Sequence, residues 1–166
     1  FVPRDLESPY EEGRLNGDVS VPVYEGKMIH QYDHRSSDVV LNSENIKRPA
    51  QPEEISIEAK RNPDCLATPR YSASGGLVCE DLSKQNWSFR WIVVQKKVTS
   101  PTNERTHIAT VLPPAGTTES LHCIFLDPDL TPSRICGLLG GLNSIVLDFA
   151  SRQKIGGENF NYFVLK

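Results

Sequence analysis

Long hydrophobic runs are missing from this sequence of 166 residues. A membrane-spanning helix needs about 20 consecutive apolar residues, and no stretch here approaches that length. The polar and acidic first residues also lack the apolar core of a secretory signal peptide. We therefore expect a cytoplasmic protein with no membrane partner. Because the chain begins with Phe1 rather than methionine, we expect it to be part of a longer protein.

Cysteines are few and are not grouped. None of the four lies in a Cys-x-x-Cys pair: Cys65, Cys79, Cys123 and Cys136. Their spacing matches neither a zinc ribbon nor a dense disulfide scaffold. We expect four reduced thiols that bind no metal.

Motifs for phosphate binding and covalent catalysis are also missing. The chain has no glycine-rich phosphate loop, no nucleophile elbow and no kinase motif. His30 and His34 are four residues apart and would share one face of a helix. However, zinc proteases need glutamate directly after the first histidine, where this chain has Gln31, and no third ligand is evident. We predict no metal site and no catalytic centre.

One loose match to an enzyme remains as a less favoured alternative. Glu58 and Lys60, with Asp33 upstream, resemble the acidic-x-Lys core of metal-dependent nucleases. Such sites use carboxylates to hold Mg²⁺ and a lysine to position the attacking water. Three-residue matches of this kind are common by chance.

The apolar pattern predicts an α+β fold with an antiparallel β-rich core. Residues 89–98 and 105–112 predict a β-hairpin, and residues 19–23 and 121–126 predict two further strands. Residues 24–35 have helical spacing. The polar segment 36–54 reads as a loop, and residues 1–18 as an exposed lead-in to a single domain over 19–166.

The clearest expected element is a long amphipathic helix over residues 132–154, followed by a short strand over residues 159–165. Thr131 suits its N-cap and Pro132 its first helical position. Gly156 and the next glycine would end it. We expect Gly137, Gly140 and Gly141 to be close-packing positions. The apolar residues form one stripe: Ile135, Leu138, Leu139, Leu142, Ile145, Val146 and Phe149.

Charge is distributed unevenly along the chain. The net charge is −3, but residues 1–64 carry 8 basic and 13 acidic side chains, whereas residues 65–166 carry 10 and 8. A local basic face is therefore compatible with an acidic protein. It would support modest phosphate binding.

Three segments resemble one protein family. These are VPVYEGKMIHQYDHR (21–35), SFRWIVVQKKVTSPTNERTHIATVLPP (88–114) and LLGGLNSIVLDFASRQKIGGENFNYFVLK (138–166), with TPRY (68–71) between the first two. They are similar to the TaqI-like C-terminal specificity region of bacterial adenine-specific DNA methyltransferases. That family includes type IIG restriction–modification enzymes and methyltransferases of BREX-like phage-defence systems. Residues 1–18 and 36–66 lie outside the resemblance.

The resemblance implies a target-recognition domain that binds double-stranded DNA and positions an adenine for methylation. S-adenosylmethionine would bind to the catalytic methyltransferase domain of the same parent chain, whose Asn-Pro-Pro-Tyr/Phe motif is absent here. A protein-interaction module of a phage-defence complex is the main alternative. Side-chain chemistry suited to phosphates and base edges marks these candidate DNA-binding residues: Lys27, Gln31, His34, Arg35, Lys96, Lys97, Asn103, Arg105, Arg152, Gln153 and Lys154.

Overall fold

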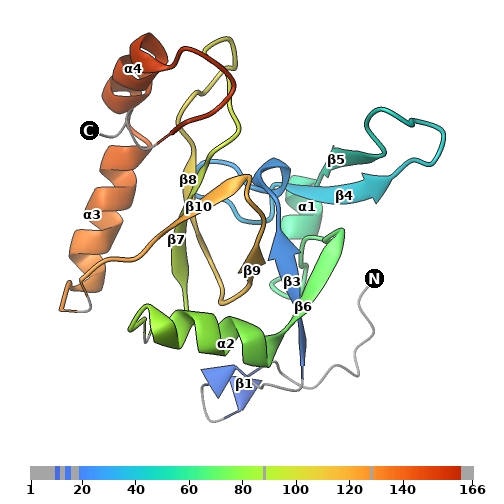
Figure 1. Ribbon diagram of the computed structural model, residues 1–166, viewed down its shortest axis with the longest axis vertical. Coiled ribbons are helices and arrows are strands. Elements are labelled where there is room, and N and C mark those ends of the chain that lie inside the picture. The colour runs from blue at the N-terminus through green and yellow to red at the C-terminus, as the bar shows by residue number, and fades with distance from the viewer. Residues whose placement is uncertain (1–9, 12–13, 16–18, 88, 128, 162–166) are drawn as a thin grey trace.

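The computed structural model of the chain describes residues 10–11, 14–15, 19–87, 89–127 and 129–161, and it has mixed α and β structure with antiparallel sheets (Figure 1). Most of the expected lead-in lies outside these residues. Its described part forms a two-stranded pair, β1 (Tyr10–Glu11) and β2 (Arg14–Leu15). Within the described residues, no helix is both long enough and apolar enough to cross a bilayer.

A three-stranded antiparallel sheet lies at the centre, in the order β10 (Leu121–Ile124), β7 (Ile92–Lys96) and β8 (Ala109–Leu112). The predicted strands over 89–98, 105–112 and 121–126 are confirmed, although each is shorter than expected. The connection between β7 and β8, residues 97–108, is therefore longer than the expected turn.

Residues of β7 alternate between two hydrophobic clusters. Ile92 and Val94 pack with Tyr24, Met28 and Ile29 on one face of the sheet. Val93 packs on the other face, against the first C-terminal helix. Since both faces are buried, Ile92, Val93 and Val94 form a continuous apolar run rather than an alternating pattern.

A second sheet lies beside the first. In it β3 (Ser20–Tyr24) pairs antiparallel with β6 (Tyr71–Ser74) and parallel with β9 (Gly116–Thr117). The expected strand over 19–23 is thus confirmed. The helical spacing of residues 24–35 was misleading, because only a 3₁₀ turn, η1 (Gly26–Met28), forms there. Helix α2 (Gly75–Lys84) was not predicted.

The segment expected to be a loop at 36–54 is a β-hairpin. β4 (Ser37–Leu41) pairs antiparallel with β5 (Ala50–Glu54), and only the tip between them is loop. A short helix, α1 (Ile57–Lys60), follows. The hairpin extends away from the rest of the molecule, and we call it the β4–β5 arm (Figure 1).

The expected long helix is wrong: the chain forms two helices, α3 (Pro132–Leu142) and α4 (Ile145–Lys154). Asn143 interrupts them because its buried side-chain amide pairs with β8. The Asn143 NH₂ donates to the Ala109 carbonyl at 2.9 Å, and the Asn143 Oδ1 accepts from the Ala109 N–H at 3.0 Å. Ser144 then caps α4 by accepting a hydrogen bond from the N–H of Leu147.

The break turns α4 over, so that its apolar stripe does not continue into the core. Ile145, Val146 and Phe149 are 75%, 79% and 65% exposed, whereas Asp148 and Ser151 are buried. Expected close packing at Gly137, Gly140 and Gly141 is also wrong, because an added methyl group would meet open space at each. The last described segment forms only an isolated bridge between Asn159 and Val98, and residues 162–165 of the expected strand lie outside the description.

We predict that Asn143→Ala lowers the free energy of unfolding by about 1–3 kcal/mol, because it leaves the buried N–H of Ala109 without its partner and removes one of the two hydrogen bonds that the Ala109 carbonyl accepts. Urea unfolding measures the change. Asn103→Ala, at an exposed position, is the control and is expected to change stability by less than about 0.5 kcal/mol. Equal stability of the two variants would contradict this role of Asn143.

Candidate nucleic-acid interface

The three segments that carry the family resemblance meet at the junction of α3 and α4. The Asn143 carbonyl accepts a hydrogen bond from the Arg105 guanidinium at 2.6 Å and from the Gln31 amide at 3.2 Å. The backbone N–H of Tyr32 donates to the Ala109 carbonyl, which Asn143 also contacts. Residues far apart in the sequence thus form one polar network, which we call the junction network.

Asp148 anchors this network from α4. Its Oδ1 accepts hydrogen bonds from the backbone N–H groups of Thr106 and His107, both at 2.7 Å. Its Oδ2 accepts from Arg152 at 3.0 Å, and Arg105 Nε lies 3.7 Å from Oδ1. Burial raises the pKa of Asp148, but the hydrogen bonds from His107, Arg152 and Thr106 outweigh burial and hold it below its ordinary value.

His107 is fully buried behind Asp148. Its Nδ1 lies 2.5 Å from the Leu142 carbonyl and its Nε2 lies 3.2 Å from Gln95 Oε1. Burial lowers the pKa of His107, more than the carbonyl of Leu142 and the charge of Asp148 raise it. This histidine links the end of α3 to the central sheet.

Five candidate DNA-binding residues make hydrogen bonds to backbone carbonyls within the protein, and one of them, Lys27, donates to the Ala50 carbonyl. Gln31 and Arg105 bind Asn143, and Arg152 binds the Glu104 carbonyl at 2.9 Å. Arg35 donates to the carbonyls of three residues at the end of α1 and just beyond it, Lys60, Asn62 and Cys65. These side chains hold loops together.

The other candidates differ in how accessible they are. His34 is half-buried, and burial first and then the charge of Arg35 lower its pKa. Burial lowers the pKa of Lys96 as well. Lys97 pairs with Glu119 at 2.5 Å. Three candidates are exposed: Asn103, Gln153 and Lys154.

The residues of the nuclease alternative do not gather into one site. Lys60 Nζ forms an ion pair with Asp33 Oδ2 at 2.7 Å, while Glu58 is exposed on α1. Across the described part of the chain, no three His, Cys, Asp or Glu side chains are grouped so as to hold a metal ion.

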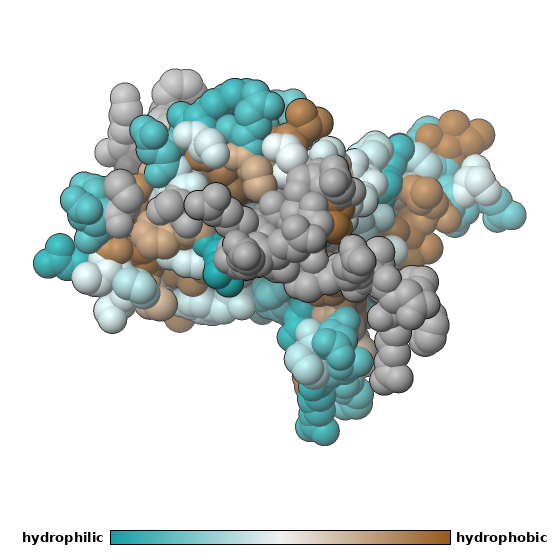
Figure 2. Space-filling model, turned by 90° about the horizontal axis from the view of Figure 1, so that it is seen from below, coloured by the Kyte–Doolittle hydropathy of each residue, from teal (hydrophilic) through white to brown (hydrophobic). Residues whose placement is uncertain are grey.

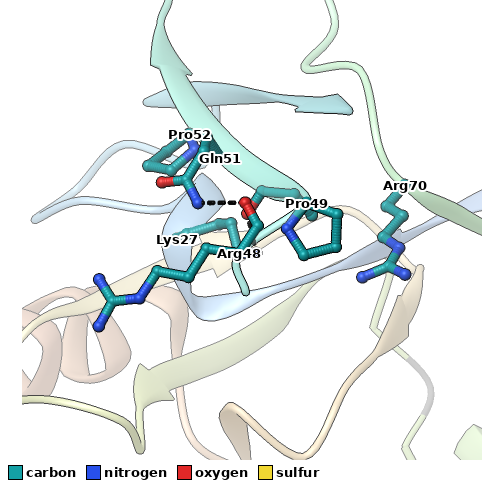
Figure 3. A pocket seen from close by; sticks show the side chains of 7 residues that line it. Lys27, Arg48, Pro49, Gln51, Pro52 and Arg70 are labelled. Atoms are coloured by element: carbon teal, nitrogen blue, oxygen red, sulfur yellow. Dashed lines mark hydrogen bonds between the residues drawn. The ribbon is translucent and has the colours of Figure 1, made fainter. Parts of the chain in front are cut away.

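The structure reveals a basic hollow on the β4–β5 arm, beside the start of β5 (Figure 3). It encloses about 330 Å³, and its charged lining residues are Lys27, Arg48 and Arg70, with the Gln51 amide beside them. Arg48 and Arg70 lie on opposite sides of Pro49 in Figure 3. None of the lining residues is acidic, so Arg48 and Arg70 make the hollow basic, while the charge of Lys27 is paired with Glu25.

The three cations are held in different ways. Lys27 Nζ donates to the Ala50 carbonyl at 3.0 Å and pairs with Glu25 at 3.1 Å. The Arg70 guanidinium lies 4.8 Å from the centre of the Tyr71 ring. Both arginines are exposed. Sequence reasoning selected only Lys27, because Arg48 lies outside the segments of the resemblance and Arg70, although it lies in TPRY (68–71), is far from Arg48 in the chain.

The β4–β5 arm carries exposed polar and apolar side chains (Figure 2). Leu41 and Ile46 are among its exposed large hydrophobic residues. Its tip also presents side chains that can contact phosphates or base edges: Asn42, Asn45, Lys47 and Arg48.

No protein-family model, curated protein or solved structure matches this chain.

We predict that Asp148→Asn costs about 1.5–3 kcal/mol of stability at neutral pH, since it weakens hydrogen bonds to a charged acceptor. The folded-state pKa lies below the ordinary 3.8. The contribution of the carboxylate is therefore full above that ordinary value and is lost as pH falls through the lower folded value.

The measurement is urea unfolding of both proteins at several pH values. The difference between them should be constant from neutral pH down to about pH 5 and should shrink below about pH 4. Asp129→Asn, at an exposed position, should show little difference at any pH. A wild-type advantage at Asp148 that grows towards low pH would contradict the assignment.

Proposed function

We propose that this chain recognises double-stranded DNA, as the specificity domain of a larger bacterial adenine DNA methyltransferase. The observation that carries the proposal is the basic hollow on a projecting two-stranded arm, beside the start of β5. The sequence resemblance of residues 21–35, 88–114 and 138–166 supports it independently. Methyl transfer from S-adenosylmethionine belongs to the catalytic domain of the parent chain.

The hollow would bind the phosphate backbone. Arginine offers several N–H donors in a planar fork that suits phosphate oxygens, and lysine adds a point charge. Lys27, Arg48 and Arg70 would thereby fix the position of the duplex without reading its sequence. Displaced counterions would make this part of the affinity salt-dependent.

The arm would read bases. The major groove of B-DNA admits a two-stranded β-ribbon, and asparagine and arginine fit the edges of adenine and guanine there. Asn42, Asn45 and Lys47 are exposed at the tip. The arm lies outside the family resemblance, as expected of a segment that sets the individual target sequence.

We predict that the double variant Arg48→Ala/Arg70→Ala weakens binding to a 30-bp duplex and lowers the slope of log affinity against log salt by about 2, because two phosphate contacts are lost. Fluorescence anisotropy at several salt concentrations measures both quantities. Both side chains are exposed, so stability should change by less than about 0.5 kcal/mol.

Lys84→Ala/Arg134→Ala is the matched control, because it removes the same charge from α2 and α3. Lys84 is ion-paired with Glu80 at 2.9 Å. The control should bind the duplex nearly as the wild type does. If both double variants had the same salt slope, the hollow would not be the phosphate site.

A protein-interaction module is the second candidate, and the exposed apolar face of α4 favours it. Ile145, Val146 and Phe149 cover the outward side of α4, whose Asp148 and Ser151 are buried. Clustered apolar exposure of this kind marks interaction sites in soluble proteins. The expected partner is another component of a phage-defence complex, and the methyltransferase domain of the parent chain is the component tested.

We predict that Val146→Ser/Phe149→Ser leaves duplex affinity and folding unchanged but abolishes association with the methyltransferase domain encoded upstream in the same gene. Sedimentation of the mixed proteins measures association. Ser133→Ala, exposed on α3, serves as the control and should associate normally. A gene without an upstream methyltransferase domain would contradict both candidates.

A further inference from the structure

A tight turn displays one aromatic side chain next to the junction network. The backbones of His30 and Asp33 exchange two hydrogen bonds, of 2.8 and 3.1 Å, around Gln31 and Tyr32. Tyr32 is 60% exposed, although it is flanked by residues that make contacts inside the protein. The ring therefore adds little to the core.

The backbone of Tyr32 is strained. Its φ is +60°, in the left-handed region where glycine or asparagine is preferred and a bulky residue is unfavourable. Asn86 is the other described non-glycine residue with positive φ, and its residue type tolerates that conformation. A glycine at position 32 would form the same turn without the strain.

The surroundings force the turn into this conformation. The Tyr32 N–H donates to the Ala109 carbonyl at 3.2 Å, and the Gln31 amide binds the Asn143 carbonyl. Asp33 accepts from the Arg35 N–H at 2.7 Å and pairs with Lys60. Several contacts therefore hold the backbone of Tyr32 in a strained conformation. Strain that is maintained by its surroundings is typical of functional sites.

We propose that the ring of Tyr32 stacks on a nucleobase that has left the base stack of the bound duplex; this inference rests on the proposed DNA-recognition function. An aromatic ring offers a flat π-surface that every base can match, and few rotamers need to be fixed for it to bind. The two-residue turn fixes the backbone of Tyr32 and leaves the residue 60% exposed. Moving a target base out of the helix is a step that adenine methylation requires.

The experiment compares a perfect 30-bp duplex of mixed sequence with the same duplex carrying one unpaired adenine. Wild-type chain should bind the second duplex about 5- to 100-fold more tightly, the range expected for one base–aromatic stack. Tyr32→Gly should bind the perfect duplex normally and lose this preference. Its melting temperature should be equal to or above that of the wild type.

Two further variants test the role of the ring. Tyr32→Phe keeps the aromatic surface and should retain the preference. Phe149→Ala removes an aromatic ring of similar exposure from an unstrained helix, and should also retain it.

The outcomes separate the inference from the proposed function. If Tyr32→Gly kept the preference, or if the wild type had none while still binding duplex, base stacking by Tyr32 would be overturned and DNA recognition would stand. If Tyr32→Gly lost affinity equally for both duplexes, Tyr32 would contact the backbone and not a base. If the wild type bound no duplex at low salt, the proposed function itself would fail.

Discussion

The free edge of the central sheet is closed by an amide side chain. β8 has β7 on one side only, so the outward N–H and C=O of Ala109 need partners from elsewhere. The side chain of Asn143 supplies a donor and an acceptor at nearly the spacing of a peptide group, and it binds both. Exposed sheet edges invite pairing with other chains, and this arrangement removes one such position.

The helices and loops nearby are consequences of that contact. Asn143 reaches the sheet only if α3 ends before it, and Ser144 starts a helix in a new orientation. The new orientation buries Asp148, whose charge then holds the backbone of Thr106 and His107. Residues 21–35, 88–114 and 138–166 all contribute to this network.

Local patterns allowed much of the fold to be predicted from the sequence. The central strands, the strand after residue 18 and the start of α3 at Pro132 follow from β-propensity and from turn and capping chemistry. The length of the C-terminal helix could not be predicted, because the apolar stripe continues through Asn143 with correct spacing. Only the tertiary contact with Ala109 reverses that local preference. The basic hollow could not be predicted from the sequence either, since Lys27, Arg48 and Arg70 line one hollow only after the arm has folded.

The arginines discussed above fall into two groups, according to whether the folded structure depends on their hydrogen bonds. Arg35, Arg105 and Arg152 lie on backbone carbonyls, so replacing them would damage packing before it changed any binding. Arg48 and Arg70 are exposed, and the fold does not require their charge. Replacing residues of the second kind would change the surface charge with little effect on stability. Tyr32 is comparable, because its ring is exposed and its backbone conformation costs stability, so the fold gains little from this side chain.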